Sequence, residues 1–462
     1  MIGKDPFPPL VPRWKSIQRA LKFALNPIPI LDKNIEEYGD TYAFHIGGFF
    51  SKGIVTTEPE IIRHVLQKNH RNYRKSNIQT KILARFLGNG LLTSEGDYWL
   101  RQRRLIQPGF HRDRIKGLIN LMNSEIHDSL AQLESQIQLN PVVDVHGEMN
   151  RLAFRIIAKA IFSTSLNEAD LQALSERITV LQKFIVRQIR QPYMRPWHHL
   201  SGQVRRHEKI SDRTKEILAR LIAQRKNSQL QEDDLLQMLL DARYEDTGER
   251  MTDEQTLDEA LVLFIAGHET SANALAWILY LLAQYDNITD KLRKEISRVV
   301  GDHSPTYDHI KELQYTRQVI EEGMRLYPPA WIIDRVSLDD DVIKGHHFAK
   351  GTLMILYVYG THRSDKLWNY PDRFDPGRFH QDHTKSIQPF SYFPFGGGPR
   401  LCIGNNFAMM EMQLTLVHFL RKFDLERIPG DDVSPLPMVT LRPKAGIPIK
   451  LSRLRESRVR HS

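Results

Sequence analysis

One short glycine-rich run decides the fold of this chain: Phe395-Gly396-Gly397-Gly398-Pro399-Arg400-Leu401-Cys402-Ile403-Gly404. It is not a phosphate-binding loop, because Asn405 follows Gly404 in place of Lys-Ser/Thr and position 401 is Leu where a dinucleotide fingerprint needs glycine. A helix predicted over residues 406–423 puts Cys402 near a helix N-terminus, where the dipole and free N–H groups favour the thiolate. A thiolate there can bind iron; the alternative is a flexible loop around a buried cysteine.

Composition and charge narrow the class of protein. The chain has 462 residues, a net charge of +9 and one cysteine, which excludes an internal disulfide and any cysteine-rich zinc or iron–sulfur site. Its 20 Phe, 15 Tyr and 6 Trp are not the composition of a disordered chain. The longest apolar run, residues 274–283, has about half the length that spans a bilayer, and no secretion signal is visible. We therefore expect a cytoplasmic protein without a membrane anchor.

The pattern along the chain is predominantly helical. Residues 1–34 form a proline-rich lead-in that we expect to be irregular, and residues 110–300 have long stretches of helical periodicity. Because no repeat, linker or shift in composition marks a boundary, we expect residues 35–455 to form one mainly α-helical domain with small β-sheets. Strand patterns are predicted in four places: residues 41–46, 53–57, 353–359 and 438–441.

The longest predicted helix begins at Thr252, which forms a capping box with Gln255, and ends near Tyr285. At ~1.5 Å per residue it is roughly 50 Å long, enough to cross the whole molecule. Its middle carries the run Ala266-Gly267-His268-Glu269-Thr270. A glycine there costs ~1 kcal/mol against alanine, so we expect it to let a ligand approach the helix.

The polar residues of this run suggest chemistry. The Thr270 hydroxyl can bond the Ala266 carbonyl, which bends the helix and leaves room for O2 and water, and Glu269 can then supply a proton. Taken alone, the run could equally be ordinary core with one polar turn. It also contains half of a zinc-protease motif, but position 272 is Ala where the second histidine should be.

Together these motifs resemble those of the cytochrome P450 family, over about residues 35–450. Residues 395–404 match its Phe-x-x-Gly-x-Arg-x-Cys-x-Gly loop, and residues 266–270 resemble its oxygen-activation motif. The resemblance implies a P450 fold whose long central helix crosses haem b, with Cys402 as axial ligand of the iron. It also implies that Phe395, Arg400 and Gly404 bind the cofactor and that Gly267, Glu269 and Thr270 form the catalytic turn.

Two further groups follow from the resemblance. Glu322 and Arg325 match the family's Glu-x-x-Arg, which binds a later arginine in a structural triad. Pro376-Gly377-Arg378-Phe379 supplies that arginine as Arg378, although Gly377 replaces the usual acid and Arg373 is a possible substitute. Four residues stand where the family binds the haem propionates: Trp99, Arg103, Arg335 and Arg400.

The substrate is less determined by sequence. By the same resemblance, six apolar residues and one acid face it: Leu92, Ile265, Ala266, Trp331, Ile333, Asp334 and Val439. Residues 187–199, in the expected lid, mix aromatic and cationic side chains that can bind an anionic or sugar-like molecule, although a solvated loop is the plainer interpretation. The expected reaction inserts one oxygen atom of O2 into a small organic molecule. This can be C–H hydroxylation or O-demethylation of a methylated sugar or aromatic.

Two other functions remain open. The first is a fatty-acid hydroxylase with a largely apolar pocket, which is the class that residues 89–94 and 327–331 resemble. The second is a non-enzymatic haem-thiolate sensor, which Glu269 and Thr270 disfavour because gas sensing needs no proton relay.

The electron source must be a separate protein, because the resemblance leaves no room for a flavin domain. We expect an acidic ferredoxin or flavodoxin with an NAD(P)H-dependent reductase. It would dock on a basic stretch that also contains Arg103, which is assigned to haem, and one acid, Asp113. Nothing else supports nucleic-acid binding, and a monomer is expected. The docking cations are Arg101, Arg104, Arg112, Arg114 and Lys116.

Overall fold

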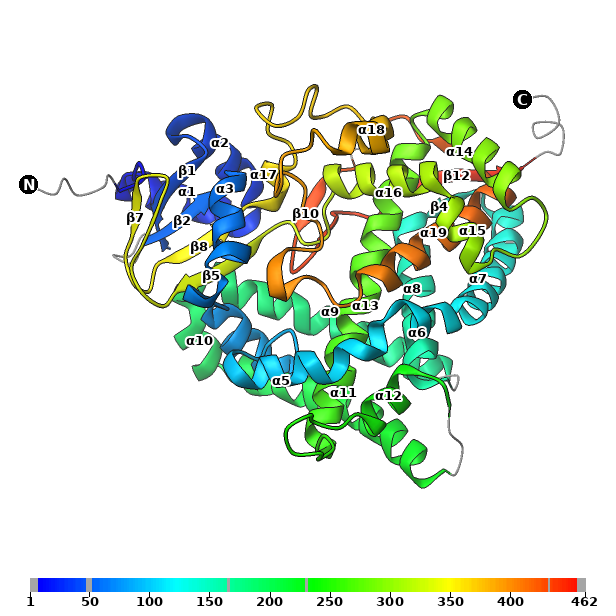
Figure 1. The fold of residues 1–462 in the computed structure, drawn as a ribbon, viewed down its shortest axis with the longest axis horizontal. Helices are drawn as coiled ribbons and strands as arrows, with labels where there is room; N and C mark the ends of the chain where they lie inside the picture. The colour runs from blue at the N-terminus through cyan, green and yellow to red at the C-terminus, as the bar shows by residue number, and fades with distance from the viewer. Residues whose placement is uncertain (1–6, 47–51, 164–166, 229–231, 431–432, 455–462) are drawn as a thin grey trace, which may run out of the picture.

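The computed structural model describes residues 7–46, 52–163, 167–228, 232–430 and 433–454 (Figure 1). Its N-terminal segment is helical, which shows that the predicted irregular lead-in is wrong: α1 (Arg13–Leu25) is followed by α2 (Ile28–Tyr38), which runs across residue 34. The prolines lie where a helix tolerates them. Pro12 and Pro27 precede the two helices, and Pro29 lies in the first turn of α2, where the missing N–H has no helical partner to lose.

A five-stranded sheet forms one end of the molecule, in the order β1-β2-β8-β5-β3. β2 and β8 are parallel and pair Gly53 with Leu353, while the other neighbours are antiparallel. The sheet therefore joins segments about 300 residues apart in sequence. Its strands are β1 (Thr41–His45), β2 (Lys52–Thr56), β3 (Tyr73–Arg74), β5 (Ile333–Ser337) and β8 (Leu353–Leu356).

Three of the four predicted strands are present. β1 and β2 are confirmed, and β8 begins as predicted but ends at Leu356, because the chain turns into α17 (Val358–Thr361). The strand predicted over 438–441 is wrong: Met438 donates to the Thr440 carbonyl in a tight turn. That turn joins β10 (Pro435–Pro437) to β11 (Leu441–Pro443). The remaining strands are β4 (Val142–Asp144), β12 (Pro448–Arg453) and β9 (Phe423–Arg427) in one sheet, and β6 (Asp341–Ile343) and β7 (His346–Phe348) in another.

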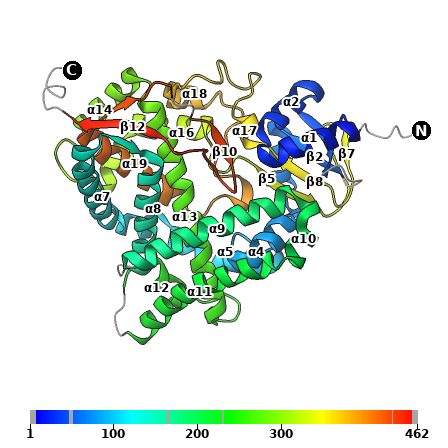
Figure 2. The same ribbon diagram turned by 180° about the vertical axis from the view of Figure 1, so that it is seen from behind.

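Helices make up the rest of the molecule. In Figure 1, α5 (Gly96–Ile106) and α19 (Asn405–Lys422) lie on the near face, whereas α9 (Glu168–Arg190) lies in front when the molecule is seen from behind in Figure 2. The other helices are α3 (Pro59–Arg63), α4 (Ala84–Leu87), α6 (Arg112–Gly117), α7 (Ile119–Leu139), α8 (Val145–Phe162), α10 (Arg195–Leu200), α11 (Gln203–Asn227), α12 (Leu235–Asp241), α13 (Asp253–Leu282), α14 (Asp286–Val299), α15 (Tyr307–Glu312), α16 (Gln314–Leu326) and α18 (Gln381–Thr384).

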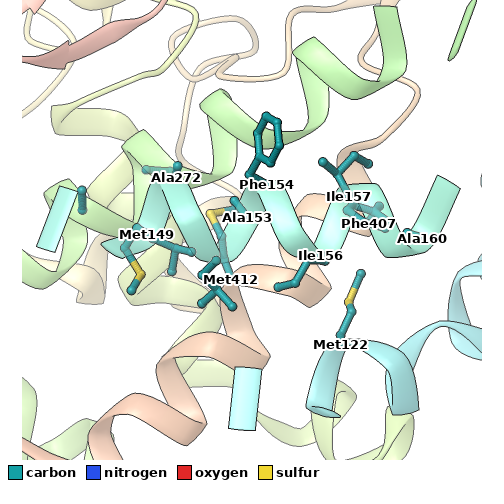
Figure 3. Close-up of a cluster of buried hydrophobic side chains, with 14 of the residues drawn as sticks. Met122, Met149, Ala153, Phe154, Ile156, Ile157, Ala160, Ala272, Phe407 and Met412 are labelled. Carbon is teal, nitrogen blue, oxygen red and sulfur yellow. The ribbon is translucent and has the colours of Figure 1, made fainter. Parts of the chain in front are cut away.

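α13 is the central helix that the sequence predicts. Its capping box is present, with Thr252 and Gln255 exchanging hydrogen bonds of 3.2 and 2.9 Å, and it ends at Leu282, slightly before Tyr285. It packs along α8, which carries Phe154 into the buried cluster (Figure 3). The Phe154 and Phe264 rings meet edge to face at 4.7 Å. In the described part of the chain, α13 is the one helix apolar and long enough to cross a bilayer, but 83% of its most apolar window is buried by the protein. It is therefore the core of the fold.

Candidate functional site

The Cys402 loop is held in a tight turn before α19. The Cys402 N–H donates to the Phe395 carbonyl at 3.0 Å, and Gly404 forms the N-cap of the helix. Gly398 has a φ of +64°, and a Cβ there would lie 1.8 Å from the Leu66 carbonyl oxygen, so this position requires glycine. The glycine-rich run therefore brings backbone against backbone to fix the position of Cys402.

Cys402 keeps an exposed side chain although it is surrounded by protein. Burial raises the pKa of its thiol, while the Gly404 N–H and the Arg103 guanidinium act in the opposite direction. The N-terminus of α19 and the Arg103 cation both favour the thiolate, as predicted. In the protein alone, these two effects are smaller than the effect of burial, which favours the neutral thiol. A bound metal cation would supply the missing charge.

The middle of α13 has accessible surface, although the turns on either side of it are buried. Ala266 is exposed and Thr270 is half-buried, while their neighbours Ile265 and Glu269 are only 7% and 6% exposed. The Thr270 hydroxyl donates to the Ala266 carbonyl at 2.8 Å, which confirms the predicted bond. Ala266 and Thr270 lie one turn apart and so share the face that borders this space.

Gly267 is half-buried, and the position that a side chain would occupy is filled from α8. A Cβ on Gly267 would lie 2.8 Å from both Cδ1 and Cγ1 of Ile157 on α8. Figure 3 shows Ile157 within the buried cluster between the two helices. The glycine is needed for close packing of α8 against α13, and its part in admitting a ligand stays a prediction.

Glu269 is bound to α9. Its Oε2 accepts a hydrogen bond of 2.7 Å from Gln182 Nε2, and both side chains are buried. Its neighbour His268 is also buried and packs edge to face on Phe154, with ring centroids 5.1 Å apart. Sequence reasoning missed Gln182, because nothing in its local pattern distinguishes it from other polar residues of α9. The contact orients Glu269, and its role as a proton source stays a prediction.

Two of the predicted propionate-binding residues form one cluster with Trp99. The Arg400 guanidinium lies 4.2 Å from the Trp99 ring and pairs with Glu95, while Arg335 is 7% exposed and donates to the Asp334 carbonyl at 2.7 Å. Burial and the charge of Arg400 lower the pKa of Arg335 to about 10. Arg400 Nη1 is buried with no hydrogen-bond partner among the described residues.

Lys75 is a fourth member of this cluster that sequence reasoning missed. Its ammonium lies 6.0 Å from the Trp99 ring and donates to the carbonyls of Leu91 and Ser94 at 2.8 and 2.9 Å. Burial and the charge of Arg400 lower its pKa to about 7. An isolated lysine gives no signal in the sequence, because its partners come from elsewhere in the chain.

Three carboxyls lie near Lys75, Arg335 and Arg400, namely Glu95, Asp334 and Glu259. Burial raises the pKa of Asp334 and raises that of Glu259 to about 7, which favours their neutral forms. The unpartnered Arg400 Nη1 fits a bound anion.

Arg103 follows Trp99 by one turn of α5 and contacts the Cys402 loop. Its Nη1 donates to the Leu401 carbonyl at 2.8 Å and its Nε to Gln107 Oε1 at 3.2 Å. Its role as a propionate ligand stays a prediction.

The predicted structural triad is complete. The Glu322 carboxylate, fully buried, accepts from Arg325 at 2.7 and 2.9 Å, from Arg378 at 3.3 Å and from the Asp375 N–H at 2.9 Å. Arg373 contributes only its carbonyl, to Arg325 at 3.2 Å, so it is not the substitute that the sequence suggested.

A residue that sequence reasoning missed connects the triad to the Cys402 loop. Arg325 donates to the His362 carbonyl at 2.7 Å, and the His362 ring nitrogen Nε2 accepts from the Phe393 N–H at 3.0 Å. Burial lowers the pKa of His362 to about 3, so it is the neutral acceptor that this bond requires.

The predicted substrate wall divides into two groups. Leu92, Ala266, Ile333 and Val439 keep accessible surface, whereas Ile265 and Trp331 are 7% and 6% exposed and pack in the core. Trp331 also donates to the Met438 carbonyl at 3.1 Å. Ser76 and Gln79 donate hydrogen bonds to the Asp334 carboxylate. The acid that was expected to face the substrate is therefore already hydrogen-bonded within the protein.

Comparisons with known proteins agree with this site. The family model described as "Cytochrome P450" matches residues 6–451. Cyclooctatin synthase of Streptomyces melanosporofaciens is 31% identical over 91% of this chain and 90% of its own. Cyclooctat-9-en-7-ol 5-monooxygenase of the same organism is 29% identical over 88% of this chain and 89% of its own. A retinoic acid-bound cyanobacterial CYP120A1 has a TM-score of 0.83 at 25% identity, over 97% of this chain and 100% of that one.

The chain belongs to the cytochrome P450 family, the haem-thiolate monooxygenases, and its cofactor is haem b. The residues of the site fit haem b. Cys402 offers an accessible sulfur that needs a cation, and Lys75, Arg335 and Arg400 offer buried positive charge that needs the anionic propionates. Ala266 and Thr270 line accessible surface on the central helix.

Proposed function

We propose that this monooxygenase hydroxylates C–H bonds of a hydrocarbon-rich, terpenoid-like molecule. One observation carries the proposal: the accessible part of the predicted wall is apolar, and its one acid, Asp334, is already bound to Ser76 and Gln79. The substrate named for one relative, cyclooctat-9-en-7-ol, and the retinoic acid bound to the solved relative are also largely hydrocarbon. A methylated sugar would find few free polar groups here, and a fatty acid is the second candidate.

Each residue of the site has a distinct task in this proposal. When bound, haem activates O2, so that one oxygen atom enters the substrate and the other leaves as water with two electrons from NAD(P)H. Cys402 supplies the thiolate, while Lys75, Arg335 and Arg400 hold the propionates with Trp99 beside them. Thr270 orients water beside Ala266 and passes on the proton that Glu269 takes from the α9 side.

The electron donor is a separate acidic ferredoxin or flavodoxin with its reductase, and the enzyme is a cytoplasmic monomer. Its single domain begins before the predicted boundary at residue 35, because α2 crosses that boundary. Support for the docking site comes from α5 and α6, where Arg104 and Arg112 form no ion pair within the described residues. Arg101 and Arg114, by contrast, are already paired with Asp246 at 3.2 Å and Asp233 at 2.8 Å. The basic surface is therefore smaller than the sequence alone suggests.

Two measurements test this function. The reduced protein under carbon monoxide should show the red-shifted Soret band of a thiolate-ligated complex, and Cys402→Ser should lose that band while keeping the far-UV circular dichroism of the fold. A screen for the low-to-high spin shift should then find a diterpene alcohol bound more tightly than palmitic acid or a methylated monosaccharide. Absence of the Soret band would refute the haem assignment, whereas a shift with only the sugar would refute the substrate class.

A further inference from the structure

An acidic segment of the chain lies against the cations proposed to bind the electron donor. Residues 232–246 include α12, and we call them the acidic strap. Their one cation, Arg243, is outnumbered by six acids: Glu232, Asp233, Asp234, Asp241, Glu245 and Asp246. Figures 1 and 2 both place α12 and α5 at the end of the molecule away from α14. The chain therefore supplies negative charge of its own where an acidic donor would dock.

Two ion pairs join the acidic strap to α5 and α6. Arg114 Nη1 lies 2.8 Å from Asp233 Oδ1, and Arg101 Nη2 lies 3.2 Å from Asp246 Oδ1. The exposed fractions of these four side chains run from 44% to 80%, so solvent reaches both pairs. Ion pairs this exposed are weak, and a carboxylate from another protein can therefore replace either acid.

A cleft of about 790 Å³ lies between the acidic strap and the two helices. Its lining includes the apolar side chains of Leu105 and Met238 together with Arg104. Arg104 is exposed and forms no ion pair with any residue that the structure describes. A docked carboxylate can thus bind Arg104 directly, whereas it must displace Asp246 to bind Arg101.

Other contacts hold the acidic strap in place without its exposed acids. The buried Tyr244 hydroxyl accepts a hydrogen bond of 2.8 Å from Gln102 Nε2 on α5. A Cβ on Gly109 would lie 2.5 Å from Met238 Sδ, so the chain before α6 packs closely on α12. Loss of the two exposed ion pairs should therefore leave the strap folded.

We propose that the acidic strap competes with an acidic electron donor for Arg101 and Arg114, so that docking replaces Asp246 and Asp233 with carboxylates of the donor. The inference rests on the donor site proposed above and adds a regulation of that site. Each turnover needs two electrons, and a ferredoxin carries one, so two donors must dock in succession. Internal competition favours release of the first donor, because the strap acids rebind the arginines that it leaves.

Stopped-flow reduction of the haem-loaded full chain tests the competition. The probe is a reduced plant-type ferredoxin at low salt under carbon monoxide. Asp233→Asn/Asp246→Asn frees both arginines, so the second-order rate constant should rise about threefold. The control, Asp290→Asn/Asp302→Asn, makes the same change in net charge on two exposed acids in and just after α14, so it should change the rate far less. Dithionite should reduce all variants at the parent rate.

The arginines separate competition from long-range charge. Arg101→Gln/Arg114→Gln should itself slow reduction by the ferredoxin. On that background, Asp233→Asn/Asp246→Asn should speed reduction no more than the α14 control does, because the acids have no arginine left to occupy. A full gain on that background, or no gain with the native arginines, overturns the competition.

The same experiment distinguishes failure of the competition from failure of the donor site. If Arg104→Glu/Arg112→Glu slows reduction and the strap variant has no effect, the donor site stands and only the competition is wrong. If reduction responds neither to salt nor to Arg104→Glu/Arg112→Glu, the donor site is wrong, and the competition is overturned with it.

Discussion

At Gly267, a hydrogen in place of a side chain lets α13 approach α8 closely. We expect Gly267→Ala to destabilise the protein by about 1–3 kcal/mol, because its Cβ would overlap Ile157. Urea unfolding measures the effect. Ile157→Ala removes both clashing atoms, so the double variant should lose less stability than the two single variants added together. Simple additivity would mean that the two residues do not interact.

Thr270, three residues further along α13, borders the accessible space. We expect Thr270→Ala to leave haem and substrate binding intact while diverting reducing equivalents into hydrogen peroxide, because the proposed proton path loses the hydroxyl that lies beside Ala266. The measurement is the ratio of product to NAD(P)H consumed. Thr256→Ala is the control, since Thr256 makes the same kind of bond, 3.0 Å to the Thr252 carbonyl, at the start of the helix. If both variants give the same ratio of product to NAD(P)H consumed as the parent enzyme, Thr270 has no part in proton delivery.

At the scale of elements, α16 holds the Cys402 loop through Glu322. Glu322→Gln should cost about 3–5 kcal/mol, because it leaves the buried charge of Arg325 uncompensated. Both the free energy of unfolding and the ratio of haem to protein absorbance should fall. Glu321→Gln on the same helix breaks only a pair with the exposed Arg317, so it should change stability by less than about 1 kcal/mol. If Glu321→Gln and Glu322→Gln lost the same amount of stability, the triad would have no special structural role.

Elements also show what the sequence can predict. The contacts predicted from local pattern alone join residues three or four apart, such as Thr270 with Ala266 and Thr252 with Gln255, because helix geometry fixes them. The long-range contact of Glu322 with Arg378 was predicted only through the family resemblance. The contacts that were missed join distant segments: Gly267 with Ile157, His362 with Phe393, and Asp334 with Ser76. Local pattern carries no information about such partners. The N-terminal helices were missed for another reason, since proline count was given more weight than proline position.

At the scale of the whole molecule, α13 separates two working faces. The side of α5, α6 and α19 carries the Cys402 loop, and the opposite side carries α9 and the lid that follows it (Figures 1 and 2). Electrons and substrate can thus reach the centre from opposite sides without competing for surface. We therefore expect changes on the donor side to leave substrate binding unaltered.

Reduction by the donor tests that separation. Reversing the unpaired cations with Arg104→Glu/Arg112→Glu should slow reduction by an acidic ferredoxin and its reductase roughly tenfold at low salt, because long-range attraction speeds encounter. The substrate-induced spin shift should be unchanged. For the parent enzyme, turnover should fall as salt rises, since the attraction is screened over ~8 Å at physiological ionic strength. Arg205→Glu/Arg206→Glu makes the same change in net charge on two exposed residues of α11, so it should reduce the rate far less. Salt-independent reduction, or equal slowing by both double variants, would place the docking surface elsewhere.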